Sequence, residues 1–242
     1  MKREYHKWFS PSLQRNMELL VFGHAGASVL FFPTRTARFY DYEDWKVIEA
    51  LRSKIEAGHL QVYCVDSIDR ESFYNEFSHP YHRMERHLQY EQYILQEVVP
   101  LMKTLNAAGS IISAGCSMGA YHAVNIAFKH PLVFVKVVGM SGRYDITQAM
   151  GNFRDLLDGY RDENVYFNMP NQFLNNLHSP EIIDQIKRLQ IILAVGEEDA
   201  FLEDNKYLST VLASKGIQNS LYIWHEEAHR ARYWRKMVQL YF

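Results

Sequence analysis

Apolar strand-like runs alternate with helical patterns along almost the whole chain, and this alternation constrains the fold more than any other feature. The predicted strands cover residues 17–22, 28–32, 60–65, 110–114, 133–140, 191–195 and 220–224. The predicted helices cover 44–57, 83–106 (bent near Pro100, which lacks the helix N–H), 118–129, 205–215 and 231–241. Such alternation predicts an α/β protein with a mostly parallel central sheet and helices on both faces.

The connection between the first two predicted strands is too short for a parallel pair. His24-Ala25-Gly26 forms the turn between the strands 17–22 and 28–32. A parallel connection needs a crossover of about a dozen residues or more, whereas antiparallel strands need only a tight turn. We therefore expect an antiparallel N-terminal edge on the sheet.

A length of 242 residues suits one α/β domain and leaves little room for a second hydrophobic core. The segment 142–188 interrupts the alternation with Gly, Asn, Asp and Pro, which predicts a loop-rich insertion. Ligands of α/β sheets bind outside the carboxyl ends of the strands. We expect a single domain over residues 1–242, in which the insertion near 142–188 acts as a substrate cap.

Charge and composition exclude several classes of protein. A formal net charge of −2 argues against a general nucleic-acid or anionic-membrane binder. No run approaches the roughly 18 apolar residues of a membrane span, and the charged N-terminus lacks the apolar core of a signal peptide. Cys64 and Cys116 lie in apolar runs and are expected to be buried free thiols, which suits a reducing compartment. We expect a cytoplasmic protein.

A Gly-x-Ser-x-Gly motif, Gly115-Cys116-Ser117-Met118-Gly119, lies between the predicted strand 110–114 and the predicted helix 118–129. A strand, a sharp turn and a helix are what a nucleophile elbow requires, and the helix N-terminus favours a developing oxyanion. Ser117 is thus the candidate nucleophile, and the backbone N–H of Met118 is the first oxyanion donor. A tight turn that merely uses Gly and Ser is the alternative, and Cys116 is expected to point into the sheet as a buried thiol.

An acid and then a base should follow the serine at the ends of later strands. The loop Glu197-Glu198-Asp199 follows the strand 191–195, and any of its carboxylates could hold an imidazole in the required tautomer. His225 and His229 come after the strand 220–224. We favour His229 as the base, because it lies deeper in the loop and has more freedom to reach the serine.

The same histidines also match a zinc-protease motif. His225-Glu226-Glu227-Ala228-His229 reads H-E-x-x-H, which binds zinc when both histidines share a helical face and a third protein ligand completes the site. Here the motif follows directly on a predicted strand, and no Glu, Asp, His or Cys occurs after His229. We interpret the match as a coincidence of spacing and expect neither a metal ion nor a cofactor.

Several segments together resemble a known family. Residues 115–123, 129–131 (Lys-His-Pro), 140–145 (Met-Ser-Gly-Arg-Tyr-Asp) and 229–235 resemble the esterase branch of the α/β-hydrolases, which includes S-formylglutathione hydrolase, feruloyl and acetyl-xylan esterases, and mycolyltransferases. The resemblance runs from about residue 28 to the C-terminus. It implies an α/β-hydrolase fold and a triad of Ser117, Asp199 and His229.

The resemblance also implies a second oxyanion donor, the backbone N–H of Arg35. Pro33-Thr34-Arg35 occupies the position of the family's oxyanion loop after the strand 28–32. This loop lacks the family's glycines, and Glu227-Ala228-His229 stands in place of its Gly-Gly-His. The chemistry survives both changes, but no particular substrate follows from the resemblance.

The predicted function is hydrolysis of a small-molecule carboxylic ester through an acyl-enzyme. A thioester substrate or an alcohol acceptor would use the same residues, and a non-catalytic interaction protein is the alternative from another class. We expect no nucleic-acid or membrane partner, and a homo-oligomer is compatible with the sequence. Arg35, Arg38, Arg230 and Arg232 lie in loops predicted to border the site, either as solvated charges or to favour an anionic substrate.

Overall fold

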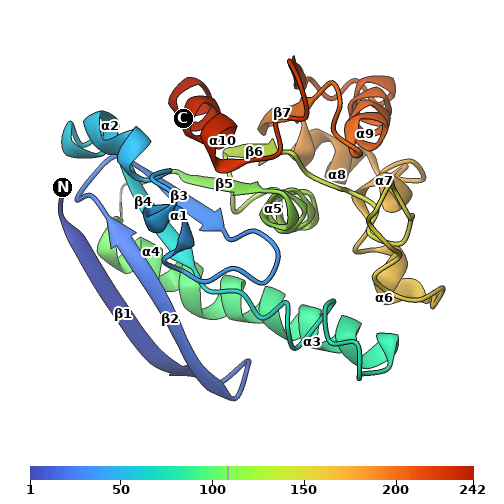
Figure 1. The fold of residues 1–242 in the computed structure, drawn as a ribbon, viewed down its shortest axis with the longest axis horizontal. Coiled ribbons are helices and arrows are strands. Elements are labelled where there is room, and N and C mark those ends of the chain that lie inside the picture. The colour runs from blue at the N-terminus through green and yellow to red at the C-terminus, as the bar shows by residue number, and fades with distance from the viewer. Residues whose placement is uncertain (108) are drawn as a thin grey trace.

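The computed structural model describes residues 1–107 and 109–242, and an eight-stranded sheet forms its centre (Figure 1). The strands are β1 (Arg3–Ser10), β2 (Arg15–Phe22), β3 (Ala27–Phe32), β4 (Leu60–Val65), β5 (Ile111–Cys116), β6 (Lys136–Met140), β7 (Gln190–Gly196) and β8 (Ser220–Trp224). Their order is β1-β2-β4-β3-β5-β6-β7-β8, and every pairing from β4 to β8 is parallel. The predicted mostly parallel sheet is confirmed.

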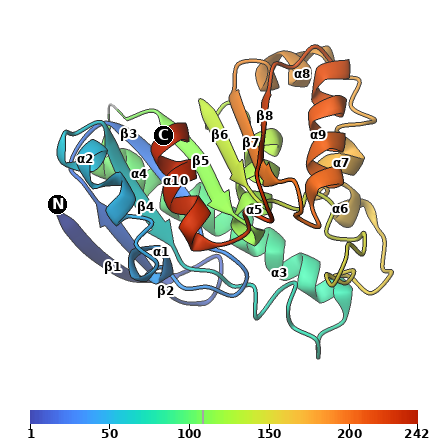
Figure 2. The ribbon, with the colours of Figure 1, turned by 45° about the horizontal axis from the view of Figure 1, so that its top comes forward.

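Helices cover both faces of this sheet (Figure 2). One face packs against α1 (Asp41–Asp44), η1 (Glu49–Leu51), α2 (Arg52–Glu56) and α10 (Ala231–Tyr241). The other packs against α3 (Pro80–Tyr93), η2 (Ile94–Val98), α4 (Val99–Leu105), α5 (Met118–Lys129), α8 (Pro180–Ile186) and α9 (Leu202–Ser214). Every residue of β4 and β5 is buried, as expected for strands covered on both sides.

The N-terminal edge is antiparallel, as predicted, but its pairing differs from the prediction. The strands 17–22 and 28–32 do not pair with each other. Instead β2 lies between β1 and β4 and is antiparallel to both, while β3 pairs with β4 and β5. The chain returns through α1 and α2 to insert β4 between them, which turn length alone does not reveal. The prediction also missed β1, an edge strand whose residues alternate between exposed and half-buried.

The helix predicted over 44–57 is broken into α1, the 3₁₀ turn η1 and α2. Lys46 takes a positive φ of 60°, and the N–H groups of Val47 and Ile48 both donate to the Tyr42 carbonyl. This local backbone arrangement ends α1 before a second turn can form.

The long helix predicted over 83–106 begins earlier, at Pro80, and contains the π turn η2 directly before the turn that holds Pro100. Proline has no N–H for the carbonyl four residues earlier. A π turn is one way in which a helix accommodates such a missing bond, so the predicted bend becomes a local change of helix type.

The predicted insertion over 142–188 lies between β6 and β7. It contains α6 (Glu163–Tyr166), α7 (Pro170–Phe173) and α8, and with α9 it forms the lobe at the right of Figure 1. The strand predicted to begin at Val133 begins at Lys136. Within residues 1–107 and 109–242, no helix has the length and apolar character needed to cross a membrane.

Candidate active site

Ser117 lies at the turn between β5 and α5 in a backbone conformation that non-glycine residues rarely adopt. Its φ is 55° and its ψ is −122°. Such a conformation costs on the order of 1–3 kcal/mol, so the surrounding contacts must impose it. The Ser117 N–H donates to the Met140 carbonyl at 2.8 Å, and the Ser117 carbonyl accepts from the Ala120 N–H at 2.9 Å. The turn is therefore bonded to both β6 and α5, and its side chain lines a cavity.

Two glycines make this sharp turn sterically possible. A Cβ on Gly115 would lie 2.2 Å from the Gly119 carbonyl, and a Cβ on Gly119 would lie 2.2 Å from the Phe32 carbonyl oxygen. Any side chain at these positions would therefore force β5, α5 and the end of β3 apart. The Tyr42 hydroxyl donates to the Phe32 carbonyl at 2.8 Å and accepts from the Cys116 N–H at 3.0 Å, which ties β3 to the turn.

Cys116, the alternative nucleophile, is fully buried in β5. Burial raises the pKa of its thiol and so disfavours the reactive thiolate. Cys64 is likewise a buried free thiol. Neither cysteine is therefore a candidate nucleophile.

His229 connects the serine to a carboxylate. Its Nε2 lies 2.9 Å from Ser117 Oγ, and its Nδ1 lies 2.8 Å from Asp199 Oδ2. The Asp199 side chain is only 2% exposed, and its other oxygen accepts from the Phe201 N–H at 3.1 Å. A carboxylate on Nδ1 keeps the proton on that nitrogen, which leaves Nε2 free to accept the proton of the serine.

Two loops that pack closely bring Asp199 and His229 together. Gly196 permits the approach, because a Cβ there would lie 2.0 Å from the Glu227 carbonyl oxygen. The Ser141 hydroxyl donates to the Ala228 carbonyl and accepts from the Trp234 indole N–H, each at 3.2 Å. The loop that carries His229 is therefore held by contacts to β7, to the residue after β6 and to α10.

The other acidic residues and the other histidine of these loops are exposed to solvent. Glu197 and Glu198 are exposed, and Glu197 pairs with the equally exposed His225. His225 and His229 lie in the loop between β8 and α10, and they contact different carboxylates. The H-E-x-x-H motif is thus not helical here, and its two histidines do not share the helical face that zinc binding by this motif requires.

The loop after β3 contributes Thr34 and Arg35 to the same cavity as Ser117 and Met118. Thr36 has a φ of 53° and donates its N–H to Asp69 Oδ2 at 3.1 Å, which anchors the loop. Among the residues that the structure describes, no acceptor is found for the backbone N–H of Met118 or of Arg35. Their role as oxyanion donors stays a prediction.

Asp69 also contacts a buried histidine that the sequence analysis did not single out. Its Oδ1 lies 3.0 Å from Nε2 of His122, and both side chains are buried. His122 lies on α5 and packs beside the rings of Phe32, Phe73 and Tyr90. The pair therefore links α5 to the loop that carries Arg35. The two residues are 53 positions apart, so no local pattern indicates the contact.

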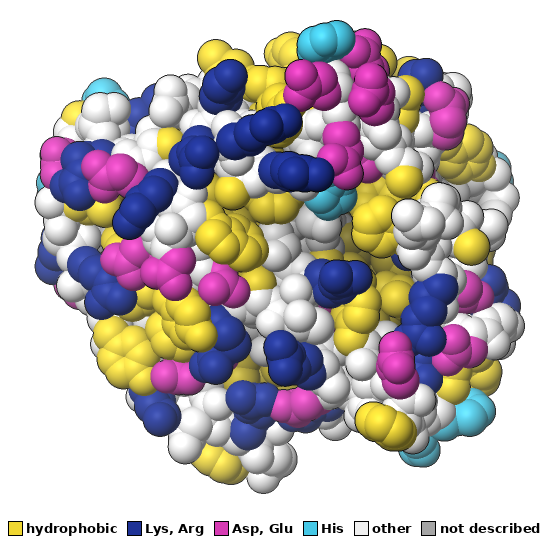
Figure 3. All heavy atoms as spheres, in the orientation of Figure 1, with side chains coloured by type: hydrophobic (Ala, Val, Ile, Leu, Met, Phe, Trp, Pro, Cys, Tyr) yellow, Lys and Arg dark blue, Asp and Glu magenta, His cyan; other side chains and the backbone are white. Residues whose placement is uncertain are grey.

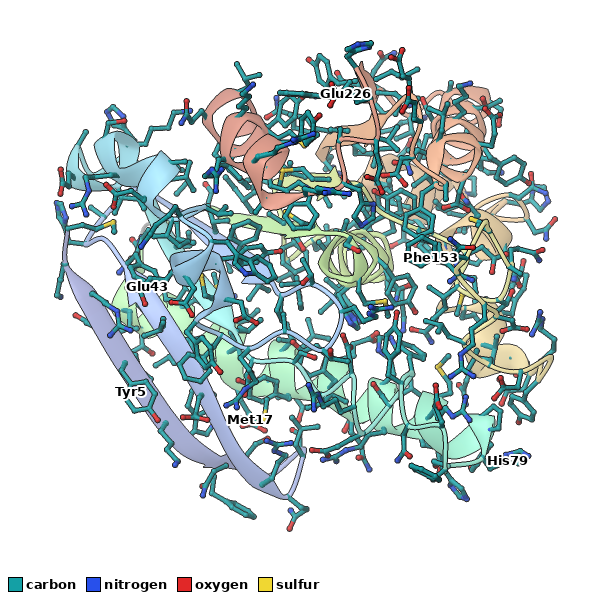
Figure 4. The ribbon with its side chains drawn as sticks, viewed as in Figure 1. Tyr5, Met17, Glu43, His79, Phe153 and Glu226 are labelled. Carbon is teal, nitrogen blue, oxygen red and sulfur yellow. The ribbon has the colours of Figure 1, made fainter. Side chains whose placement is uncertain are left out.

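The cavity in front of Ser117 has a volume of about 280 Å³. Phe201 and Trp234 line it near His229, and the insertion supplies Arg143, Ile146, Phe153 and Leu156. In Figure 3 the surface is hollowed near the centre of the view, where hydrophobic side chains gather beside basic ones. Phe153, labelled in Figure 4, lies beside α5, and its ring centroid is 6.3 Å from that of His229.

Of the four arginines predicted to border the site, Arg35 lines the cavity. Arg38 instead pairs with Asp66 and Glu18, while Arg230 and Arg232 pair with Glu227 and Glu226. Arg143, which no charge argument from the sequence singled out, also lines the cavity and is buried. Its position three residues after the end of β6, at the carboxyl edge of the sheet, is the signal that could have indicated it.

Comparisons with known proteins identify the family and the fold of the chain. A family model described as "Putative esterase" matches residues 40–236. No curated protein matches the chain. Three solved structures with similar folds, a ferulic acid esterase, an S-formylglutathione hydrolase from Agrobacterium tumefaciens and the Staphylococcus aureus fluorophosphonate-binding serine hydrolase FphF, have TM-scores of 0.76, 0.74 and 0.66. They are 14%, 18% and 16% identical in sequence, and the matches cover 99%, 98% and 99% of this chain and 95%, 91% and 96% of theirs.

Proposed function

The chain belongs to this esterase family and is a carboxylic ester hydrolase, and from that premise we propose that it cleaves small-molecule esters through an acyl-enzyme formed on Ser117. His229 is the general base, and Asp199 orients and stabilises its imidazolium. The observation that supports this assignment is the continuous hydrogen-bonded chain from Ser117 Oγ through His229 to Asp199, which opens onto a cavity at the carboxyl edge of the sheet.

The reaction has two chemical steps. Ser117 Oγ attacks the ester carbonyl carbon while His229 Nε2 takes the hydroxyl proton, and the same imidazolium then protonates the departing alcohol. Water attacks the acyl-enzyme in the second step, again through His229, and releases the acid and the free serine. Asp199 accepts hydrogen bonds with both oxygens, one of them from His229, and it stabilises the positive imidazole at each step.

The tetrahedral oxyanion binds to the backbone N–H groups of Met118 and Arg35. The Met118 N–H lies at the N-terminus of α5, where the helix dipole also favours negative charge. A donor of this kind contributes roughly 3–4 kcal/mol to transition-state stabilisation in comparable sites. Thr36, anchored to Asp69, keeps the loop with Arg35 in place beside the serine.

The insertion over 142–188 acts as the cap of this site within a single domain. Its residues Ile146, Phe153 and Leu156 supply apolar walls to the cavity, and the Phe153 ring also packs on Phe201 at a centroid distance of 4.5 Å. An apolar cover excludes bulk water and strengthens the electrostatic contacts beneath it. A compact acyl or aryl group is the substrate portion that such walls contact.

A covalent probe tests the nucleophile directly. We expect treatment with a fluorophosphonate to add one adduct to the wild type by intact-mass analysis and none to Ser117→Ala. Ser117→Ala should also lose about 10⁶-fold in kcat for 4-nitrophenyl acetate, as when the nucleophile of a comparable triad is removed.

Ser214→Ala, which changes an exposed serine at the end of α9, is the matched control and should label as the wild type does. An unlabelled wild type, or an adduct that persists in Ser117→Ala, would contradict the proposal.

A further inference from the structure

A buried arginine without a carboxylate partner lines the proposed active site. Arg143 is 5% exposed and contributes to the same cavity as Ser117. Its Nε donates to the Asp145 carbonyl at 3.2 Å, and its Nη2 donates to the carbonyls of Ile146 at 3.0 Å and Arg154 at 2.8 Å, and also to that of Gln148. Its Nη1 has no acceptor in the described part of the chain.

Two carboxylates that act electrostatically on Arg143 accept hydrogen bonds from other groups. Asp145 accepts from the Thr147 hydroxyl at 2.6 Å and from the Gln172 side-chain amide at 2.9 Å. Asp204 accepts from the Asn171 side-chain amide at 2.6 Å and from the Tyr144 N–H. Within residues 1–107 and 109–242, no Asp or Glu forms an ion pair with Arg143. The Arg143 side chain therefore hydrogen-bonds only to neutral carbonyl groups in the described structure, and the carboxylates of Asp145 and Asp204 act on its charge without a direct contact.

This arrangement is unfavourable for a cation unless something else compensates it. Burial lowers the pKa of Arg143, although arginine stays charged in proteins. A buried charge without a partner is costly, and a charged partner with good geometry removes most of that cost. An anion that enters the cavity and accepts from Nη1 would be such a partner.

The other residues that line the cavity also favour an anionic ligand. The charged residues that line it in the described structure are Arg35 and Arg143, with no Asp or Glu among them. The Arg35 guanidinium lies 5.7 Å from the centre of the Tyr74 ring, which lines the same cavity. The Tyr74 hydroxyl has no hydrogen-bond partner among the described residues, and burial raises its pKa, so it stays protonated and able to donate.

We propose that Arg143 is a substrate-recognition residue that selects esters with a carboxylate near the scissile bond, and that Tyr74 is its second hydrogen-bond donor. This inference rests on the proposed esterase function and names the substrate class of the same site. Arg143 has a double role in this proposal: its Nε and Nη2 hold the loop over 145–154, which leaves Nη1 as the donor to the ligand. Charge-assisted bonds to carboxylates are among the strongest that proteins form.

Two pairs of esters that differ by one carboxylate test the inference on either side of the ester bond. Mono-4-nitrophenyl adipate and 4-nitrophenyl hexanoate differ in the acyl part, and 3-acetoxybenzoate and methyl 3-acetoxybenzoate differ in the alcohol part. We expect the wild type to favour the anionic member of at least one pair by about tenfold or more in kcat/KM. Arg143→Met should lower that preference by about tenfold or more, and Arg143→Lys should retain part of it.

Arg154→Met is the matched control, since this exposed arginine belongs to the same insertion and its side chain does not line the cavity. It should keep the wild-type preference within about twofold. Equal kcat/KM for both members of both pairs in the wild type would overturn the inference while leaving the esterase function intact. An equal loss for both members in Arg143→Met would also overturn it and assign the residue to loop structure alone.

Inhibition of the wild type covers the case in which the Arg143 variants do not fold. Benzoate and benzamide have the same shape, and we expect benzoate to inhibit 4-nitrophenyl acetate hydrolysis about tenfold more strongly. Equal inhibition by the two would then overturn the inference. If the wild type hydrolyses none of these esters, the proposed function fails, and the assignment of Arg143 fails with it.

Discussion

Two histidine–aspartate pairs lie close to the start of α5, and their surroundings differ. In the pair His229–Asp199 the contact is 2.8 Å, and the second ring nitrogen lies 2.9 Å from Ser117 Oγ beside a cavity. In the pair His122–Asp69 the contact is 3.0 Å, and both side chains are buried. No hydroxyl group in the described structure bonds to the His122 ring, which packs among aromatic side chains.

An imidazole–carboxylate pair has no chemical function of its own until its second ring nitrogen meets a partner. Beside a hydroxyl and open space, the pair can move a proton to and from a substrate. Enclosed by rings, it can only hold two segments of the chain together. Here the buried pair holds α5 to the loop with Thr36, so it supports the site that the other pair is proposed to operate.

The sharpest test of this contrast replaces the carboxylate of the proposed catalytic pair. Asp199→Asn should lower kcat for 4-nitrophenyl acetate by about 10⁴-fold, because an amide no longer enforces the imidazole tautomer or stabilises the imidazolium. Thermal unfolding should shift little. Glu197→Gln, an exposed change in the same loop, should stay within about twofold of the wild type. A loss of kcat below about tenfold in Asp199→Asn would contradict the catalytic role of the His229–Asp199 pair.

The same Asp→Asn change in the buried pair should lower stability more, and activity less, than Asp199→Asn does. Asp69 accepts from both His122 and the Thr36 N–H, and an asparagine can accept from only one of them with its carbonyl oxygen. Asp69→Asn should therefore lower the free energy of unfolding by about 1–3 kcal/mol and reduce kcat/KM by about tenfold through the displaced loop.

Urea unfolding and steady-state kinetics measure both effects, with the exposed Glu76→Gln as control. An unchanged stability together with a loss of activity as large as that of Asp199→Asn would assign a catalytic role to the buried pair.

A smaller expected effect is on the stability of the protein in acid, through a histidine that is buried beside His122 of α5. His87 is buried, its ring centroid lies 5.5 Å from that of His122, and burial lowers its pKa from 6.5 to about 3. The unfolded chain therefore takes up a proton on this residue below about pH 6.5, whereas the folded protein does so only near pH 3. The free energy of unfolding should accordingly fall as the pH drops through this window.

His87→Gln has no titrating group there and can still donate to Asn168, which lies 3.2 Å from His87 Nε2. Its stability should fall less than that of the wild type between about pH 7 and about pH 4.5 in urea titrations. Parallel losses in both proteins would show that His87 does not contribute to the pH dependence.

Much of the fold follows from local sequence patterns. The turn with Ser117 is an example, because the apolar run of β5, the two glycines and the apolar helix that follows act within about fifteen residues. β1 is a counterexample, since an edge strand with one solvated face needs few apolar residues and shows little pattern. The place of β4 between β2 and β3 was also missed, because sheet order depends on which edges the returning chain meets.

Some features of the candidate site likewise follow from the sequence, and others do not. The order of a serine, an acidic loop and a histidine loop after successive strands is visible in the sequence. The sequence left Glu197, Glu198 and Asp199 as alternatives, and burial distinguishes them, because Asp199 is the one enclosed against His229. Arg143 is the clearest example of a site residue that the sequence could not predict. It follows a strand end in the sequence, but nothing there says that it is buried and lines the cavity without an ion-pair partner in the described structure.

The sequence alone was enough to predict an α/β sheet, a serine at a sharp turn before a helix, and an acidic loop and a histidine loop that follow it. These features depend on the conformational preferences and apolar periodicity of neighbouring residues. The tertiary structure alone showed which carboxylate is enclosed against His229, which histidine is buried against Asp69, and which arginines line the cavity. Side-chain surroundings are set by segments far apart in the chain, since packing and burial depend on all of them at once.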